Sequence, residues 1–257
     1  KGETGPVTLE ARLQYRKLDT AYLRHIQGDR FVRNDLPILI LAEDRVTLPV
    51  IGGPTAAGQP EQPANGFPAW QRWNDYGIGL LRKPRNSQLR QAEEAFARLE
   101  ASGHGDGALN LARVYLADGR LHEAALALER ASQGEHPAPP WTATWIGALV
   151  DRQNGYLDRA VAGFEAILDT RFAEARRRGF DFSQDYRVLD ALGETLYERA
   201  RQERGEARKG ERERLLRSAA ERFEQTLALD PEDLAAHHNL AQVHQALGDV
   251  ALAEQHR

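Results

Sequence analysis

The stretch GDGALNLARVYLADGRLHEAALALERASQGEHP, residues 105–137, decides the fold. Asp118 and Gly119 separate its two halves, and a turn is typical of such a pair. Small and apolar residues recur at helical spacing in each half: Leu111, Ala112 and Tyr115, then Ala124, Leu128 and Ala131. The pattern predicts two short helices joined by a tight turn, a hairpin of about 34 residues that cannot bury its apolar face alone.

The same pattern continues from Trp70 to the end of the chain. Small residues at matching positions predict five units, at about 70–102, 105–138, 140–173, 186–231 and 234–257, the last of them truncated. We therefore predict a mainly α fold, a helical-hairpin solenoid of about five units. The fourth unit contains an Arg- and Glu-rich insertion at 201–214, which predicts two lengthened helices.

Residues 1–51 do not follow the repeat and are predicted to form a small β-rich segment. Residues 7–16 alternate apolar and polar side chains, and the runs 36–41 and 45–51 also favour strands. Residues 20–27 suit one or two helical turns. Pro and Gly are frequent between residues 52 and 69, and this stretch is predicted to be a linker.

Composition excludes several classes of function. The 257 residues carry 34 basic and 38 acidic side chains, a net charge of −4, which argues against nucleic acid as a partner. No apolar run approaches the roughly 18 residues of a membrane span, so a soluble chain is expected. The sequence has no Cys, and therefore no disulfide, thiolate metal site or covalently attached haem is expected within it.

Catalytic and metal-binding motifs are also missing from the sequence. It has no GlyXxxSerXxxGly elbow, no phosphate-binding Gly-rich loop and no HisGluXxxXxxHis motif. His237 and His244 lie seven residues apart, which is a poor spacing for two ligands of one metal ion. We expect a protein that is not an enzyme and holds no metal. The alternative is an enzyme whose site uses Glu43 and Asp44 at the junction of the β segment and the helices.

The stretch DPEDLAAHHNLAQVHQALGDVALAE, residues 230–254, closely resembles a tetratricopeptide repeat (TPR), and the resemblance covers 70–257. In TPR proteins the first helix of each unit lines a groove that binds a protein or peptide. The resemblance implies these groove residues: Asn110, Arg113, Arg152, Tyr197, His238, Asn239 and Gln242. A second surface for an acidic partner is predicted at Arg176, Arg177 and Arg178, which lie beside phenylalanines.

The whole chain also resembles the C-terminal TPR region of bacterial multihaem c-type cytochromes. LQYRKLDTAYLR at 13–24, LPILILA at 36–42, VTLP at 46–49 and RFAEARRRGFDFSQDYRVL at 171–189 carry this likeness. It implies a periplasmic or extracellular scaffold of a redox assembly, with no cofactor in this piece and haem on an upstream segment. The expected partner is a protein or peptide, a haem-bearing module, or another copy that docks on the open end of the solenoid.

Overall fold

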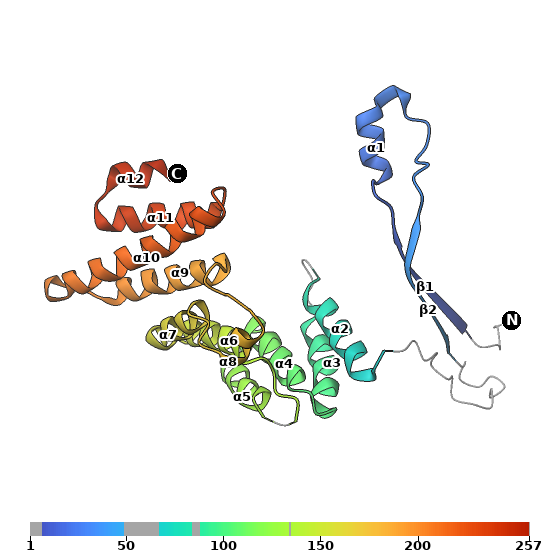
Figure 1. Cartoon of the computed structure of the whole chain (residues 1–257), viewed down its shortest axis with the longest axis horizontal. Coiled ribbons are helices and arrows are strands. Elements are labelled where there is room, and N and C mark those ends of the chain that lie inside the picture. Colours follow the sequence, from blue (N-terminus) through green and yellow to red (C-terminus); the bar gives the residue numbers. More distant parts are fainter. Residues whose placement is uncertain (1–6, 49–66, 84–87, 134, 257) are drawn as a thin grey trace. The chain divides into compact units, whose positions relative to one another are not determined.

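The computed structural model describes residues 7–48, 67–83, 88–133 and 135–256 (Figure 1). The chain divides into two compact units, Lys1–Phe67 and Pro68–Arg257. The predicted linker, 52–69, lies outside the described residues except for 67–69. Within the described ranges, no helix has both the length and the apolar character that a membrane crossing requires.

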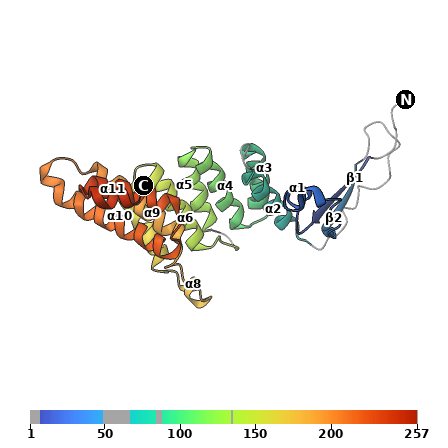
Figure 2. The same cartoon turned by 90° about the horizontal axis from the view of Figure 1, so that it is seen from above.

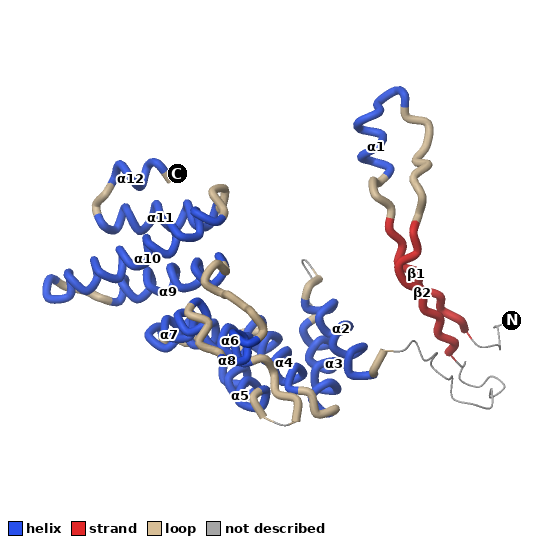
Figure 3. The backbone as a smooth tube through the Cα atoms, viewed as in Figure 1, coloured by secondary structure: helices blue, strands red, loops and turns tan. Residues whose placement is uncertain are grey.

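The N-terminal unit is a two-stranded antiparallel ribbon with a helix in its connection (Figure 3). Strand β1 (Val7–Tyr15) pairs with β2 (Leu39–Leu48), and helix α1 (Thr20–Gln27) and a 3₁₀ turn at Gly28–Arg30 lie between them. Asp19 caps α1 by accepting a hydrogen bond from the Tyr22 amide. Leu23 is buried, whereas every residue of β1 is exposed.

The prediction of two separate strands at 36–41 and 45–51 is wrong for the described residues, because one strand, β2, runs through 39–48 without a break; residues 36–38 are not in a strand, and 49–51 lie outside the described residues. Two charged residues of β2 have partners across the ribbon. Arg12 lies 3.2 Å from Glu43, and Arg45 pairs with Glu10. Paired charges on one exposed face allow the strand to continue through them. A register shift between Leu13 and Gln14 changes the strand pairing at the end of the ribbon where Tyr15 pairs with Leu39.

The second unit is a stack of helical hairpins that follow one another in chain order (Figures 1 and 2). The hairpins pair α2 (Ala69–Leu81) with α3 (Leu89–Ala101), α4 (Gly105–Ala117) with α5 (Leu121–Ala131), α6 (Pro140–Gln153) with α7 (Leu157–Leu168), α9 (Tyr186–Gln202) with α10 (Lys209–Leu229), and α11 (Leu234–Leu247) with α12 (Val250–Gln255). The predicted solenoid of about five units is confirmed. We call the face formed by α2, α4, α6, α9 and α11 the groove.

Three phenylalanines on the second helices form the centre of the packing. Phe96, Phe164 and Phe223 are fully buried, and each lies on a different second helix. A Cβ atom on Gly193 would lie 2.8 Å from the Phe223 ring, so α9 approaches α10 closely only because residue 193 has no side chain. Gly77 has the same relation to Phe96. Gly77 and Gly193, two of the small residues that recur along the repeats, are thus the positions at which the first helices contact these phenylalanine rings.

Two departures from a regular repeat distinguish the fourth hairpin. Helices α9 and α10 contain 17 and 21 residues, against 11 in α5, so the predicted lengthening by residues 201–214 is confirmed. A short helix that the sequence did not predict, α8 (Ala173–Arg177), lies between α7 and α9 and projects from the stacked hairpins in Figure 2. We call residues 169–185 the insert.

Candidate functional site

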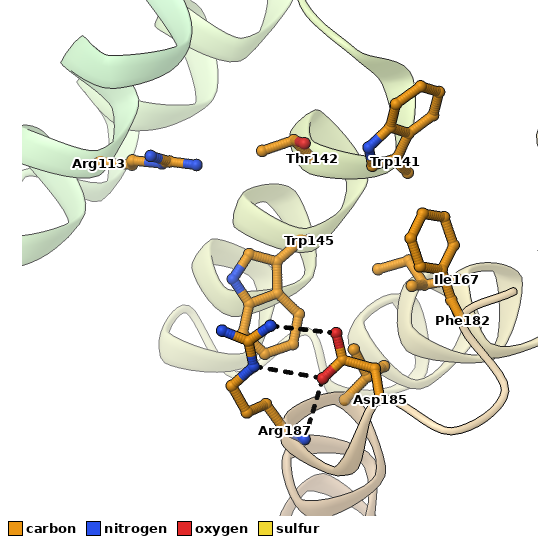
Figure 4. Close-up of a pocket in the computed structure, with 9 residues that line it drawn as sticks. Arg113, Trp141, Thr142, Trp145, Ile167, Phe182, Asp185 and Arg187 are labelled. Atoms are coloured by element: carbon orange, nitrogen blue, oxygen red, sulfur yellow. Dashed lines mark hydrogen bonds and ion pairs between the residues drawn. The ribbon is translucent and has the colours of Figure 1, made fainter. Parts of the chain in front are cut away.

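A pocket of about 290 Å³ opens on the groove where α4, α6 and α9 meet (Figure 4). Its lining combines aromatic, aliphatic and charged side chains: Arg113, Trp141, Thr142, Trp145, Ile167, Phe182, Asp185, Arg187 and Val188. Three consecutive hairpins therefore contribute to one hollow. A mainly apolar pocket with a few convergent polar groups is the ordinary form of a binding site.

The insert supplies one wall of this pocket through Phe182. The chain leaves α7 at Thr170, which has a left-handed backbone with φ of 46°. The Thr170 hydroxyl accepts a hydrogen bond of 3.1 Å from the Phe182 amide, and its carbonyl accepts one of 2.7 Å from Arg176. These bonds tie both arms of the insert to the end of α7. They hold Phe182 beside Trp141, with 6.1 Å between the ring centroids.

Asp185 and Arg187 neutralise one another at the start of α9. Asp185 is the N-cap residue of α9 and accepts a 3.1 Å hydrogen bond from the Arg187 amide. The Arg187 side chain returns to the same carboxylate, with Nε and Nη2 each 3.3 Å from an Asp185 oxygen. Figure 4 shows this closed arrangement. The pair contributes no net charge to the pocket.

Arg113 is different, because it forms no hydrogen bond or ion pair with any other residue that the structure describes. Figure 4 shows it reaching from α4 toward Thr142. Burial lowers the pKa of the Arg113 guanidinium, and nearby Asp106 offsets only part of that effect. Burial of a cation is costly, and binding of a further anion beside Arg113 would relieve more of that cost.

A second hollow, of about 490 Å³, lies over the same three helices toward their C-terminal ends. Leu116, Leu149, Arg152, Gln153 and Glu198 line it. Arg152 is fully partnered there, since it donates to Glu194 and to Glu198, the latter over 3.1 Å from Nε. Glu194 also accepts a 3.3 Å hydrogen bond from Asn239 on α11. This network crosses α6, α9 and α11 and carries more acidic than basic groups.

Asp190 lies one helical turn before Glu194 and has no cationic partner among the described residues. The Thr226 hydroxyl donates a 2.7 Å hydrogen bond to it from α10. Burial raises the pKa of Asp190 to about 6; Thr226 opposes the rise, and the negative charges of Asp233 and Glu194 add to it. The carboxylate is therefore destabilised in the folded chain at neutral pH.

Replacing Asp190 with Asn is expected to stabilise the fold at pH 8. The ordinary pKa of 3.8 applies in the unfolded chain, so the native chain loses stability as the pH rises from about 4 to above 6. Asn keeps the acceptor for Thr226 and does not ionise. The variant should be more stable by about 1 kcal/mol at pH 8, allowing for solvent screening, and nearly unchanged at pH 4. Urea unfolding at both pH values measures this, and an equal effect at both would contradict it.

The structure brings some of the sequence-predicted groove residues together and separates others. Arg113 lines the pocket and Arg152 the second hollow, while Asn239 joins the network of Arg152 through Glu194. Tyr197 packs against the core of the last three hairpins. His238 is exposed, and its ring accepts or donates a 2.6 Å hydrogen bond with Gln242. His238 and Gln242 are not among the residues that line the two hollows.

Asn110 differs from its expected placement. It was predicted to offer its amide to a bound peptide, but its side chain is only 4% exposed. The amide donates a 2.9 Å hydrogen bond to Asn74 of the preceding first helix. Because neighbouring first helices approach each other closely at this position, Asn110 joins α4 to α2 inside the fold.

The predicted patch of three arginines is divided among separate roles. Arg176 holds the insert to Thr170, as described above. Arg178 lies over the rings of Phe180 and Trp141, at 4.8 and 5.6 Å from their centroids, and pairs with Glu174. Arg177 is exposed, and its side chain forms no hydrogen bond or ion pair with the described residues. The three guanidinium groups do not share one function.

The alternative site at Glu43 and Asp44 is not supported by the geometry of β2. Neighbouring residues of a strand point to opposite faces, and Glu43 pairs with Arg12 while Asp44 accepts a hydrogen bond from the Arg45 amide. The two carboxylates therefore do not form an acid–base pair.

The histidines form contacts that sequence spacing did not indicate. His237 Nδ1 lies 2.9 Å from His256 Nδ1, and the His104 ring stacks between Trp70 and His136. Each of these contacts joins two parts of the chain that are far apart in the sequence. Over the part of the chain that the structure describes, no group of three or more His, Asp or Glu side chains is arranged to hold a metal ion.

Sequence reasoning missed most of the pocket, including Trp141, Trp145, Phe182, Asp185 and Arg187. The available signal was the extra sequence between the third and fourth units, where an ordinary repeat continues at once. Aromatic residues on both sides of that extra segment could have suggested a wall added to the groove.

Comparison with known proteins supports the fold alone. No family model matches the chain, and no curated protein matches it. PilF of Pseudomonas aeruginosa superposes with a TM-score of 0.54 at 16% identity, covering 73% of each chain. MamA of Desulfovibrio magneticus RS-1, from residue 41 to its end, gives 0.52 at 15%, covering 74% of this chain and 92% of that one. An IFIT1 mutant bound to m7Gppp-AAAA gives 0.52 at 18%, covering 73% and 39%. The chain shares with these proteins a TPR-like helical solenoid.

Proposed function

We propose that the chain is a non-catalytic protein-interaction module that binds an extended segment of a partner protein in the groove. The observation that carries this proposal is the position of the two hollows, which lie on the same three first helices, α4, α6 and α9. An extended segment that crosses these helices can place side chains in both. The aromatic lining of the first hollow suits an anchoring side chain.

The charged groups of the groove favour binding over catalysis. Arg187 and Arg152 are held by carboxylates, and Arg113 and Asp190, which form no ion pair with the described residues, lie on separate helices. A nucleophile with a hydrogen-bonded base is the usual mark of a catalytic centre, and the pocket lining contains no such pair. The groove therefore resembles a recognition surface more than an active site.

Selection of displayed twelve-residue random peptides on the full chain tests this function. Replacing Thr142 with Phe should fill the pocket without removing any core side chain, and it should weaken the selected peptides at least about tenfold. Replacing Ala125 with Phe adds the same ring to the exposed face of α5 and should leave binding unchanged. Equal binding by the two variants would place the peptides outside the groove and overturn the proposal.

We further propose that the partner belongs to an exported multihaem redox assembly, in the periplasm or outside the cell. This proposal rests only on the resemblance of residues 13–24, 36–42, 46–49 and 171–189. The chain has no Cys, so a covalently bound haem would belong to another segment or to the partner, and no cofactor is proposed for the described residues. Haem absorbance that copurifies with the chain would support this context. Self-association is the alternative, and a molecular mass that rises with concentration would favour it.

A further inference from the structure

Strand β1 is an edge of the two-stranded ribbon, and its outer side has no partner strand among the described residues (Figure 3). All nine of its residues are exposed, including Leu9 and Leu13, at 57% and 61%. Of the side chains that the structure describes between residues 7 and 48, only that of Leu23 is buried. A two-stranded ribbon is at most marginally stable in water, and a third strand or more is needed for independent stability. The free backbone groups of β1 are therefore available to pair with a further strand.

The sequence of β1, VTLEARLQY, is complementary to itself when two copies pair antiparallel about a two-fold axis at Ala11. The facing pairs are then Val7–Tyr15, Thr8–Gln14, Leu9–Leu13, Glu10–Arg12 and Ala11–Ala11. Apolar side chains meet apolar ones, and polar side chains meet polar ones. The pair of opposite charge forms twice, because the two-fold axis makes the copies equivalent. Facing pairs of these kinds stabilise antiparallel strands.

The ion pairs within each ribbon continue across this contact. In one copy Glu10 pairs with Arg45 of β2, and Arg12 lies 3.2 Å from Glu43 of β2. Directly opposed residues of antiparallel strands share a face of the sheet, so all four side chains lie on one face. Joining two copies forms a row of alternating charge across four strands, namely Arg45, Glu10, Arg12 and Glu43, the last two from the second copy. The two-fold axis generates an identical second row.

We propose that β1 is a dimerisation strand, through which two copies of this chain form a four-stranded antiparallel sheet in the order β2–β1–β1–β2. Only β1 takes part in the contact, so the residues of the groove lie outside it. The proposal therefore neither needs nor excludes the proposed function. It also differs from docking of a second copy on the open end of the solenoid, which would not involve a pair of β1 strands.

The charges of β1 specify the register of the pairing. A shift of two residues in one direction would set Glu10 against Glu10, and a shift of two in the other would set Arg12 against Arg12. A shift of one residue would oppose apolar to charged side chains, because side chains alternate between faces. In-register parallel pairing would set each charge against its equivalent. The register centred on Ala11 uses the full strand and opposes unlike charges.

The outer edge of β2 is less suited to such a contact. The register shift leaves Leu41 without an opposite residue in β1, so the bulged residue lies on β2 and the β1 edge is regular. A bulge interrupts the ladder of an edge strand and protects it from further pairing. In addition, the register that sets Glu43 against Arg45 of another copy would set Asp44 against Asp44. The complementary edge is therefore that of β1.

Sedimentation velocity of the full chain over a range of concentrations tests the proposal. A species of twice the chain mass of 28.8 kDa should form as the concentration rises. Arg12→Glu and Glu10→Arg each set like charges against each other twice in the contact, and each should weaken the dimer at least about tenfold. Arg33→Glu makes the same change of charge in the exposed connection of the same unit and should leave the dimer unchanged.

An equimolar mixture of Arg12→Glu and Glu10→Arg separates loss of the contact from loss of the fold. In a mixed dimer one copy supplies both basic side chains and the other both acidic ones, so unlike charges face each other at both pairs. The mixture should dimerise at concentrations at which neither variant does alone. A ribbon unfolded by the substitutions could not recover in this way. A mixture that dimerises no better than its components would contradict the proposal.

A single cysteine tests the position of the two-fold axis, since the sequence has no Cys. In the proposed dimer the two side chains at Ala11 face each other, with Cβ atoms about 4.5–5.5 Å apart. Ala11→Cys should therefore form a disulfide-linked dimer under mild oxidation, as seen by non-reducing electrophoresis. Thr8→Cys is the matched control, because its two copies would lie six residues apart along the strands, about 20 Å, and should not be linked.

Three results would overturn the proposal. One is a chain that stays monomeric at every concentration. Another is a dimer whose stability is the same in Arg12→Glu and Glu10→Arg as in the original chain, which would place the contact elsewhere, for example on the open end of the solenoid. The third is equal cross-linking of Ala11→Cys and Thr8→Cys. None of these results bears on peptide binding in the groove, which the Thr142→Phe variant tests separately.

Discussion

Replacing Phe223 with Ala is expected to lower the free energy of unfolding by about 3–5 kcal/mol, the usual cost of deleting a fully buried aromatic ring. The ring is 0% exposed and belongs to the core of the last three hairpins. It fills the space that Gly193 leaves on α9, so its loss opens a cavity between α9 and α10. Urea unfolding followed by far-UV circular dichroism measures the change.

The close fit of Phe223 to Gly193 can be tested by changing both sides. Gly193→Ala alone should destabilise the fold by about 1–3 kcal/mol, because its Cβ would overlap the ring. Combining it with Phe223→Leu should recover part of that loss, since the smaller side chain leaves room for the methyl group. Additive effects of the two substitutions would show that the contact is not a tight one.

Replacing Gly107 with Ala is expected to cost about 3 kcal/mol, because the added atom would meet backbone. Its Cβ would lie 2.2 Å from the amide nitrogen of Glu100 and 2.6 Å from the Glu100 Cα. Neither atom can rotate away as a side chain can. Helix α4 would have to move from the end of α3, which disturbs the junction of the first two hairpins. The same urea unfolding measurement applies.

Gly147 provides the matched control for Gly107. It also lies within a first helix, but the nearest atom to an added Cβ is Leu128 Cδ1 at 3.7 Å, an ordinary contact. Gly147→Ala should therefore raise stability by about 0.5–1 kcal/mol through the better helix propensity of Ala. A comparable loss in both variants would contradict the role of close backbone approach at Gly107.

The repeat itself could be predicted from the sequence because it depends on local pattern. Apolar spacing identifies each helix, and Gly119 and Gly155, both with positive φ, mark turns between paired helices. The long fourth hairpin followed from the same spacing. These features need no knowledge of distant parts of the chain.

The parts that were missed depend on contacts between distant residues. Helix α8 has only five residues and no apolar periodicity, and its position depends on bonds to Thr170. Strand β2 runs through Asp44 and Arg45 because β1 supplies a charge opposite Arg45. Neither relation is visible in the segment's own sequence.

The groove was predictable only in part, for the same reason. A consensus position indicates the face on which a side chain lies, and it placed Arg113 and Arg152 in the two hollows. It does not indicate whether a neighbouring repeat satisfies that side chain. Asn110 is satisfied by Asn74, whereas Arg113 forms no hydrogen bond or ion pair with the described residues. That difference separates a structural residue from a candidate binding residue.

A crystal structure of the full chain with the tightest library-selected peptide tests the central claim most directly. We predict that the peptide lies over α4, α6 and α9 and places one side chain in the pocket beside Trp141, Trp145 and Phe182. A peptide bound on the second helices would contradict the claim.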